Sequence, residues 1–465
     1  MTEQTRARVD RGSPRALRWL RLALWCGGGW GLGGCSGDER PRPLADGRGR
    51  PVEGCEKFSY QTCDIREADC QGDLFGLVAC LRGESAAADG PPPVTLLSEA
   101  EAIELLQGPA QPAADPTAED DFSPSVRGLE LLGLIDPGLI SAPSDVVDVT
   151  IQALAAFYQP STRAVVIIDR GDPLGDLDAD ATLAHEFVHA LQDRRHDLQT
   201  FGGDADIESD RALALTSVVE GEATLYQLQL ILAYQGVNLK QANYAGMFGS
   251  LVAQGDQLAS SAGSPMVTAA AIFPYTYGAR YMGEHWLRGS HQALDQLYAQ
   301  PPESSLQVMW EGSGDVPAIE AFDVMPSPLD GYRFVVDDVA GAWVMFSRLL
   351  DLSGGVGSAS TLRTLASHWR GDRLWVYQSR DGASDTAVVW SIDWSDAVSA
   401  TQFGELFARF HPDPAAIQIE TLGKRSRVVV AERAGDLDAW SLRAADGSPS
   451  AEGPRLNTPE STPKP

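Results

Sequence analysis

Residues 183–193 read Leu-Ala-His-Glu-Phe-Val-His-Ala-Leu-Gln-Asp, and this segment constrains the chain more than any other. Its apolar spacing predicts a helix, with His185 and His189 about 40° apart around the axis. Both imidazoles can therefore reach one Zn²⁺ at about 2.0–2.1 Å. Glu186 lies one step further around, where a general base could take a proton from water at the metal. The alternative is that both histidines are core residues of an amphipathic helix.

A zinc centre of this kind needs a third protein ligand and one open coordination position. His196 is rejected, because a metzincin-type third histidine would stand one position earlier, where Arg195 is found, and the expected glycine is absent. Glu220 is the better candidate. It lies 31 residues beyond His189, on a second long helix expected over about 208–234. A helix, loop and antiparallel helix would bring this carboxylate to the metal.

The order of strand, HExxH helix and glutamate helix resembles that of the gluzincin metallopeptidases. Several gluzincin families carry their glutamate ligand in a Glu-Gly-x-Ala context, which residues 220–223 match. The resemblance implies that Glu220 is the third ligand. Periodicity alone does not separate it from Glu222, and Gly221 would let the two helices approach closely.

Two signatures of better-defined gluzincins are missing. A thermolysin-like protein would carry an aspartate at position 224, where this chain has Thr224, so the carboxylate that orients a ligand histidine is not located. Asp193 and Asp210 are the substitutes considered. The Gly-x-Met-Glu-Asn signature of aminopeptidases is also absent, and exopeptidase activity is therefore not expected.

Four segments carry a narrower resemblance: TLAHEFVHALQD, ALTSVVEGEATL, FPYTYG and HWRGDRLWVY. They look like poorly characterised exported bacterial and archaeal HExxH proteins of gluzincin type, over roughly residues 125–410. The resemblance implies a zinc-dependent endopeptidase that hydrolyses peptide bonds with water activated by Glu186. The alternative function is a catalytically inactive surface lipoprotein that uses the zinc site as a structural element or as a scaffold for binding partners.

Peptide hydrolysis also needs a donor to the oxyanion of the tetrahedral intermediate. Tyr275 and Tyr277 offer two phenols on a turn constrained by proline and glycine, and both are catalytic candidates. The alternative for each is a packing aromatic. His285 is a weaker donor candidate.

The N-terminus is typical of an export signal. Six arginines precede an apolar stretch that is too short to cross a bilayer and that ends in Leu32-Gly-Gly-Cys35. This ending resembles the lipobox of bacterial lipoproteins, in which the cysteine is acylated and becomes the first residue. The resemblance implies anchoring through Cys35 in the cell envelope. Because Ser36 follows the cysteine, the outer membrane or surface of a Gram-negative bacterium is expected. A plain signal peptide is the alternative.

Four further cysteines fall within 26 residues: Cys55, Cys63, Cys70 and Cys80. In an exported protein they predict two disulfides of unknown connectivity. A zinc site made of all four is the alternative, but no pair has the Cys-x-x-Cys spacing.

The composition and the turn signals divide the chain into seven parts. The expected class is α+β, with a mostly helical zincin-like core of strand, HExxH helix and glutamate helix, followed by a C-terminal α+β region. The parts are a signal peptide (1–34), a tether (35–52), a cysteine-rich module (53–83), a linker (84–97), the metallopeptidase core (98–328), the C-terminal region (329–444) and a disordered tail (445–465). The formal net charge of −28 argues against nucleic-acid binding. A peptide or protein substrate is expected.

Overall fold

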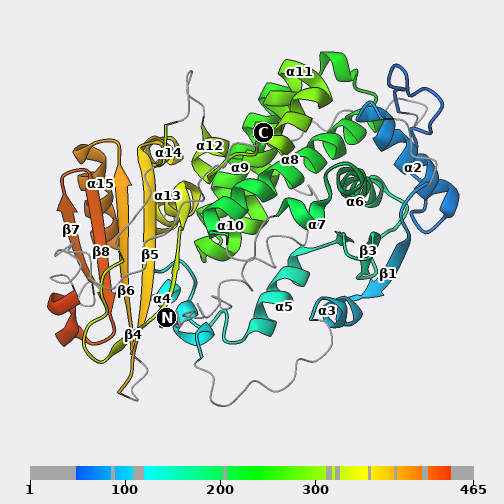
Figure 1. Ribbon diagram of the computed structural model, residues 1–465. Helices are drawn as coiled ribbons and strands as arrows, with labels where there is room; N and C mark the ends of the chain where they lie inside the picture. Colours follow the sequence, from blue (N-terminus) through cyan, green and yellow to red (C-terminus); the bar gives the residue numbers. More distant parts are fainter. Residues whose placement is uncertain are drawn as a thin grey trace, which may run out of the picture.

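The computed structural model combines helices and sheets, so the chain is α+β as expected (Figure 1). It describes residues 49–84, 90–107, 120–202, 207–310, 317–319, 325–353, 358–381, 385–410 and 417–440. The predicted signal peptide, Cys35, almost all of the tether, and the tail therefore lie outside the described residues. Among the residues described, no helix combines the length and the apolar character needed to span a membrane.

Helices make up most of the middle of the chain (Figure 1). The α-helices are α2 (Ala68–Leu81), α3 (Glu99–Gln107), α4 (Phe122–Leu131), α5 (Pro143–Ala153), α6 (Leu177–His196), α7 (Leu198–Phe201), α8 (Ser209–Tyr234), α9 (Tyr244–Ala259), α10 (Pro265–Phe273), α11 (Ala279–Ala299), α12 (Ser305–Met309), α13 (Gly341–Ser353), α14 (Ala359–Ser367) and α15 (Ala397–Phe410). A π-helical turn, η2 (Pro274–Gly278), joins α10 to α11. Short 3₁₀ turns are η1 (Leu239–Gln241) and η4 (Ala434–Asp436).

Two sheets lie at opposite ends of the molecule (Figure 1). The small one has the order β1-β3-β2, with β3 parallel to β1 and antiparallel to β2. Its strands are β1 (Val94–Ser98), β2 (Ala156–Gln159) and β3 (Ala164–Asp169). The large one is antiparallel, with the order β4-β5-β6-β8-β7. Its strands are β4 (Tyr332–Asp338), β5 (Trp369–Ser379), β6 (Thr386–Trp394), β7 (Ile417–Leu422) and β8 (Arg425–Ala431).

Successive side chains along a strand point to opposite faces, and the large sheet uses both faces. Leu374 and Val376 of β5 join a core cluster that also contains residues of α4, α13 and α15. Trp375 and Tyr377, from the same strand, join a separate cluster that contains Trp440. Burial on both faces explains the continuous apolar runs at 374–377 of β5 and 387–390 of β6.

The helix that carries the HExxH motif is α6. Its N-cap is Asp176, whose carboxylate accepts a hydrogen bond from the Ala179 N–H at 3.0 Å. Two further aspartates, Asp178 and Asp180, lie in its first turn. The helix ends at His196, and its C-cap, Asp197, has a φ of 51°. The neighbouring α8 is buried on almost every face, as expected for an apolar helix at the centre of a fold.

One segment departs from its local sequence pattern. The apolar residues over 144–158 have the spacing of a single helix, but α5 ends at Ala153, and residues 156–159 form β2. Phe157 and Tyr158 pair with Val166 and Val165 of β3, so sheet pairing outweighs the local helical pattern.

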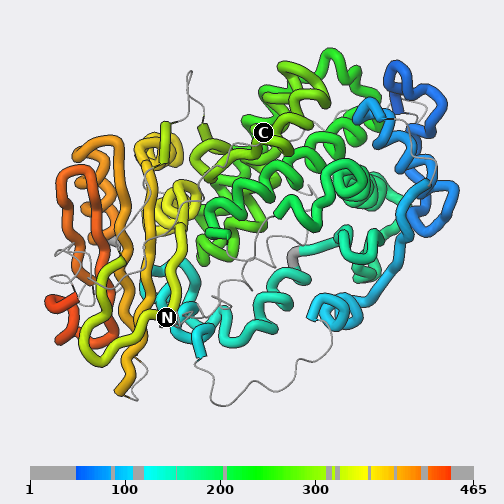
Figure 2. The backbone as a smooth tube through the Cα atoms, viewed as in Figure 1, coloured from blue at the N-terminus to red at the C-terminus, as the bar shows by residue number. Residues whose placement is uncertain are grey.

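Both predicted disulfides are present, and they join Cys55 to Cys80 and Cys63 to Cys70. The cysteine-rich segment packs against the rest of the chain, and its α2 lies against α6 and α8 (Figure 2). Phe75 of α2, for example, meets Phe187 of α6 edge to face, with ring centroids 5.4 Å apart. The segment therefore shares a core with the helix that bears the motif.

Asp210, Asp338 and Asp372 are three buried acids where the start of α8 meets β4 and β5. Asp210 accepts hydrogen bonds from the backbone N–H and the hydroxyl of Ser305. Burial, together with the nearby charges of Asp372 and Asp338, raises the pKa of Asp210 to about 8 against the lowering effect of Ser305. The folded state therefore holds a proton that the unfolded chain releases near pH 4, so this group's contribution to stability falls as the pH rises from about 4 to 8.

We expect Asp210→Asn to stabilise the protein at alkaline pH. The asparagine oxygen keeps the acceptor for Ser305 and removes the buried charge. The melting temperature of the variant should exceed that of the wild type at pH 9 by roughly 1 °C for each kcal/mol gained, and it should not do so at pH 5. Thermal unfolding at both pH values tests this, and an equal difference at the two would contradict it.

Candidate metal centre

The structure brings His185 and His189 of α6 together with Glu220 of α8. Glu220 Oε2 lies 3.1 Å from His185 Nε2 and 3.4 Å from His189 Nε2. One donor atom from each of the three residues lies within 4.8 Å of those from the other two, so the group could hold a metal ion. All three residues are buried, with at most 3% of their surface exposed.

The spacing of these donors suits a small tetrahedral ion. Bonds of 2.0–2.2 Å at tetrahedral angles place neighbouring ligand atoms about 3.4 Å apart. The two nitrogen–oxygen distances to Glu220 Oε2, 3.1 and 3.4 Å, are close to that value. Two imidazoles and one carboxylate are also a ligand set that zinc favours. The residues present therefore fit a zinc ion.

The two histidines keep Glu220 in its ionised form. Burial alone would raise the pKa of Glu220, but His189 and His185 hold it well below its usual value. Burial alone would lower the pKa of His189, but the attraction of Glu220 outweighs burial and raises it to about 9. For His185 burial prevails, and its pKa is lowered. An ionised carboxylate thus lies between two rings that offer nitrogen donors.

Glu186 is completely buried beside this group. Among the described residues, neither of its carboxylate oxygens has a partner within the usual hydrogen-bond limits, although the backbone N–H of Tyr158 is close enough to lower its pKa. Burial, together with the charge of Glu220, raises the pKa of Glu186 to about 8 against the opposing effects of His189 and Tyr158. A buried carboxylate without partners costs free energy, so this residue has no evident structural role.

The two glutamates that periodicity left unresolved have different partners. Glu220 contacts the histidines, whereas Glu222 accepts hydrogen bonds from Arg82 at 2.9 and 3.1 Å and from Tyr298 at 2.6 Å. His196, rejected as a ligand, stacks on Tyr298 with ring centroids 3.8 Å apart.

The partner that orients His189 is Gln192, which the sequence analysis missed. His189 Nδ1 lies 2.8 Å from Gln192 Oε1. The two suggested substitutes have other partners: Asp193 accepts from the hydroxyl of Tyr158 and the N–H of Leu198, and Asp210 accepts from Ser305. The spacing of three residues between His189 and Gln192 on one helix was the available signal.

The structure distinguishes the two candidate tyrosines. The ring of Tyr275 stacks on that of His185, with centroids 6.0 Å apart and an interplanar angle of 27°, and Tyr275 is only partly buried. Tyr277 is fully buried, packs on Phe273 and donates its hydroxyl hydrogen to Asp256 at 2.6 Å. Tyr275 therefore adjoins the metal-binding group, and Tyr277 has the contacts of a packing aromatic.

His285, the weaker donor candidate, makes contacts within its own helix. Its Nδ1 lies 2.9 Å from the backbone oxygen of Tyr281, and the two rings are in contact. These contacts give it no evident role at the metal centre.

Gly221 does permit a close approach, but with η2 and α11 rather than with α6. A Cβ atom at this position would lie 2.4 Å from the backbone oxygen of Gly278 and 2.9 Å from Met282 Cγ. Glu220 is thereby fixed next to the turn that carries Tyr275.

We expect Gly221→Ala to destabilise the protein by about 1–3 kcal/mol, because the added methyl group meets a backbone carbonyl that cannot move freely. The midpoint of urea unfolding measures the change. Gly249→Ala is the matched control, because Gly249 also lies within a helix but has no neighbouring atom within 4 Å of an added Cβ. The control should gain up to about 1 kcal/mol. Equal effects of the two substitutions would contradict the close contact.

Comparison with known proteins identifies one matching family. A family described as a domain of unknown function (DUF8575) matches residues 332–441. The matched segment contains the large sheet with α13, α14 and α15, and it excludes the metal-binding group. No curated protein and no solved structure matches the chain.

Proposed function

We propose that this protein is a zinc-dependent metallopeptidase of gluzincin type, acting as an endopeptidase. The observation that carries the proposal is the buried, unpartnered carboxylate of Glu186 next to a group of two histidines and a glutamate. A purely structural metal site needs only its ligands, and an additional buried acid without partners would weaken it. General-base catalysis is the chemistry that requires an acid in this place.

The residues of the site have separate roles in the proposed reaction. His185, His189 and Glu220 would hold the zinc ion, which, when bound, supplies a Lewis acid that polarises a carbonyl group and makes water more acidic. Glu186 accepts the proton of the attacking water and transfers it to the leaving amine. Tyr275 is the donor that would stabilise the oxyanion, because its ring adjoins His185.

A peptide substrate is supported by the small sheet. β2 lies at the edge of this sheet and packs against α6, and among the described residues it pairs only with β3. The N–H of Tyr158 on β2 also influences the pKa of Glu186, so this strand runs beside the catalytic carboxylate. An extended peptide can add to such an edge through main-chain hydrogen bonds.

One observation favours the alternative, a catalytically inactive lipoprotein with a structural metal site. His185, Glu186, His189 and Glu220 are all nearly inaccessible to solvent. Hydrolysis requires a substrate to reach the metal, and Tyr275, whose ring contacts His185, is partly exposed.

The place of action is proposed from the N-terminal sequence. A signal peptide over residues 1–34 and lipid attachment at Cys35 would hold the enzyme in the cell envelope, at the outer membrane or surface of a Gram-negative bacterium. The two disulfides are consistent with an oxidising compartment outside the cytoplasm.

The test combines metal analysis with a cleavage assay. Purified protein should contain about one zinc ion per chain, cleave members of a broad peptide library at internal bonds, and lose this activity to a chelator. Activity should return with added zinc. Bound zinc without cleavage of any library member would contradict the peptidase proposal and favour the alternative, and protein that binds no zinc would contradict both.

A further inference from the structure

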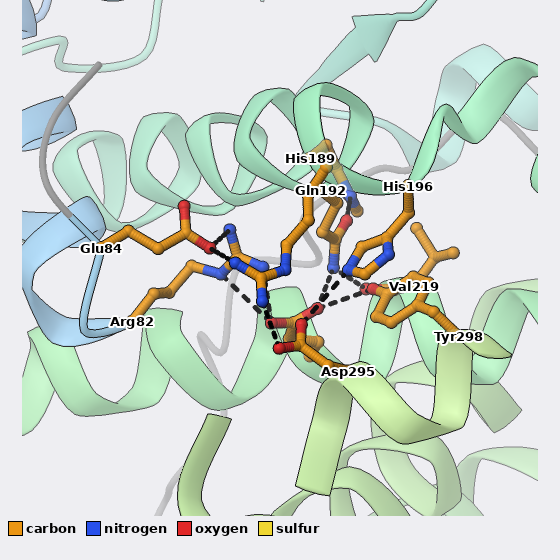
Figure 3. A network of polar contacts seen from close by, with 10 residues as sticks. Arg82, Glu84, His189, Gln192, His196, Val219, Asp295 and Tyr298 are labelled. Carbon is orange, nitrogen blue, oxygen red and sulfur yellow. Dashed lines mark hydrogen bonds and ion pairs between the residues drawn. The ribbon is translucent and has the colours of Figure 1, made fainter. Parts of the chain in front are cut away.

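A buried chain of hydrogen bonds extends from His189 away from the metal-binding group, and the proposed hydrolysis does not use it (Figure 3). His189 Nδ1 lies 2.8 Å from Gln192 Oε1. The amide nitrogen of Gln192 donates to the backbone oxygen of Val219 at 2.9 Å and to Glu222 Oε2 at 3.0 Å. Glu222 Oε1 accepts from Arg82 at 2.9 and 3.1 Å. Gln192, Glu222 and Arg82 are each at most 3% exposed.

The direction of these hydrogen bonds follows from the chemistry of the groups. The carbonyl of Val219 can only accept, and so can the Glu222 carboxylate, which receives two N–H groups from Arg82. Gln192 must therefore turn its NH₂ group toward both of them and its oxygen toward His189. Because an amide oxygen only accepts, His189 Nδ1 must carry the hydrogen. In the neutral ring the lone pair then lies on Nε2, the atom that is 3.4 Å from Glu220 Oε2.

We propose that Gln192, Glu222 and Arg82 are positioning residues of the metal centre, which together hold His189 in the tautomer and orientation that present Nε2 to the metal. The inference rests on the proposed function, because it requires that His189 be a metal ligand. Outer hydrogen bonds of this kind fix ring orientation and raise the basicity of a ligand. Gln192, which is hydrogen-bonded to Glu222, here replaces the single carboxylate that the sequence analysis sought as the partner of a ligand histidine.

This series of hydrogen bonds also gives the cysteine-rich segment a role at the metal centre. Arg82 follows α2 directly and lies two residues after Cys80, which is bonded to Cys55. It reaches Glu222 across 140 residues of sequence. Tyr298 of α11 donates to the same carboxylate, so residues from α6, α8 and α11 and the C-cap of α2 meet at Glu222. The disulfide-bonded segment thus supplies Arg82, the last residue in the series of hydrogen bonds that orients His189.

The first arm of the test replaces Gln192 with methionine, which has a similar shape but no amide. Zinc affinity, measured by competition with a chromophoric chelator, should fall about 10- to 100-fold. The visible spectrum of the cobalt(II)-loaded protein, which reports the geometry of the ligands, should also change. Gln229→Met is the matched control, because Gln229 is a buried glutamine of α8 outside the chain of hydrogen bonds. This control should bind zinc as the wild type does.

The second arm is the double exchange Gln192→Glu with Glu222→Gln. The new glutamate still accepts from His189 Nδ1, the new glutamine donates to it, and the glutamine oxygen still accepts from Arg82, but the hydrogen bond to the Val219 carbonyl is lost. The exchange keeps the total charge and the acceptor for His189, so the zinc affinity and the cobalt spectrum should lie between those of Gln192→Met and the wild type. A purely structural role for Gln192 would change the melting temperature but not the affinity of the folded protein.

The results separate this inference from the proposed function. Wild-type affinity in Gln192→Met, or a double exchange as weak as Gln192→Met, would overturn the positioning role while leaving zinc binding and hydrolysis intact. Failure of the wild type to bind zinc would overturn both. Should Gln192→Met fail to fold by circular dichroism, the double exchange decides: an affinity within about 10-fold of the wild type supports the inference, and a larger loss in a folded protein overturns it.

Discussion

Replacing Glu186 with glutamine is expected to abolish hydrolysis and to leave the metal in place. Glutamine has the same shape but cannot accept a proton, and general-base catalysis contributes roughly 10²–10⁴-fold to rate. Because Glu186 is not one of the three residues that converge on the metal position, zinc content should be unchanged. The substitution also removes a buried carboxylate that lacks partners, so the melting temperature should not fall.

Cleavage of the best library peptide and the zinc content of Glu186→Gln are measured on the same sample. Glu104→Gln is the matched control, because it neutralises an exposed glutamate on α3 and should retain full activity. Wild-type turnover by Glu186→Gln would remove this residue from the mechanism. Loss of zinc from the variant would instead make Glu186 part of the metal-binding group.

Replacing Glu220 with alanine is expected to remove the metal and, with it, all activity. The substitution takes away the only carboxylate of the candidate metal group and leaves two imidazoles. The loss of affinity should exceed the roughly 10- to 100-fold that removal of an outer partner costs. Mass spectrometry of the native protein and chelator competition both measure it.

A substitution of the neighbouring Glu222 tests whether Glu220 or Glu222 is the ligand, a choice that helical periodicity left open. Glu222→Gln keeps an acceptor for Arg82 and leaves all three ligands in place, so it should retain zinc with a smaller loss of affinity. Retention of zinc by Glu220→Ala together with its loss from Glu222→Gln would reverse the assignment of the two glutamates.

The sequence was most informative where local geometry decides the outcome. A spacing of four residues on a helix was sufficient to place His185 and His189 on one face, and the resemblance to gluzincins indicated Glu220 over Glu222. The α+β class and the two disulfides were also predicted correctly. The metallopeptidase activity and the lipid anchor remain predictions.

The features that the sequence did not indicate depend on contacts between distant parts of the chain. Arg82 reaches Glu222 from the cysteine-rich segment, and no local pattern indicates that pairing. The end of α5 at Ala153 depends on β2 pairing with β3, which outweighs the helical spacing. Only packing distinguishes Tyr275, next to His185, from Tyr277, which donates to Asp256.

The most direct test is a crystal structure of the zinc-loaded protein with anomalous data collected at the zinc absorption edge. We predict a single strong anomalous peak bonded to His185 Nε2, His189 Nε2 and a Glu220 oxygen, with a fourth position open to solvent. A peak at another place, no peak at all, or a fourth protein ligand closing the site would contradict the assignment of this centre as catalytic.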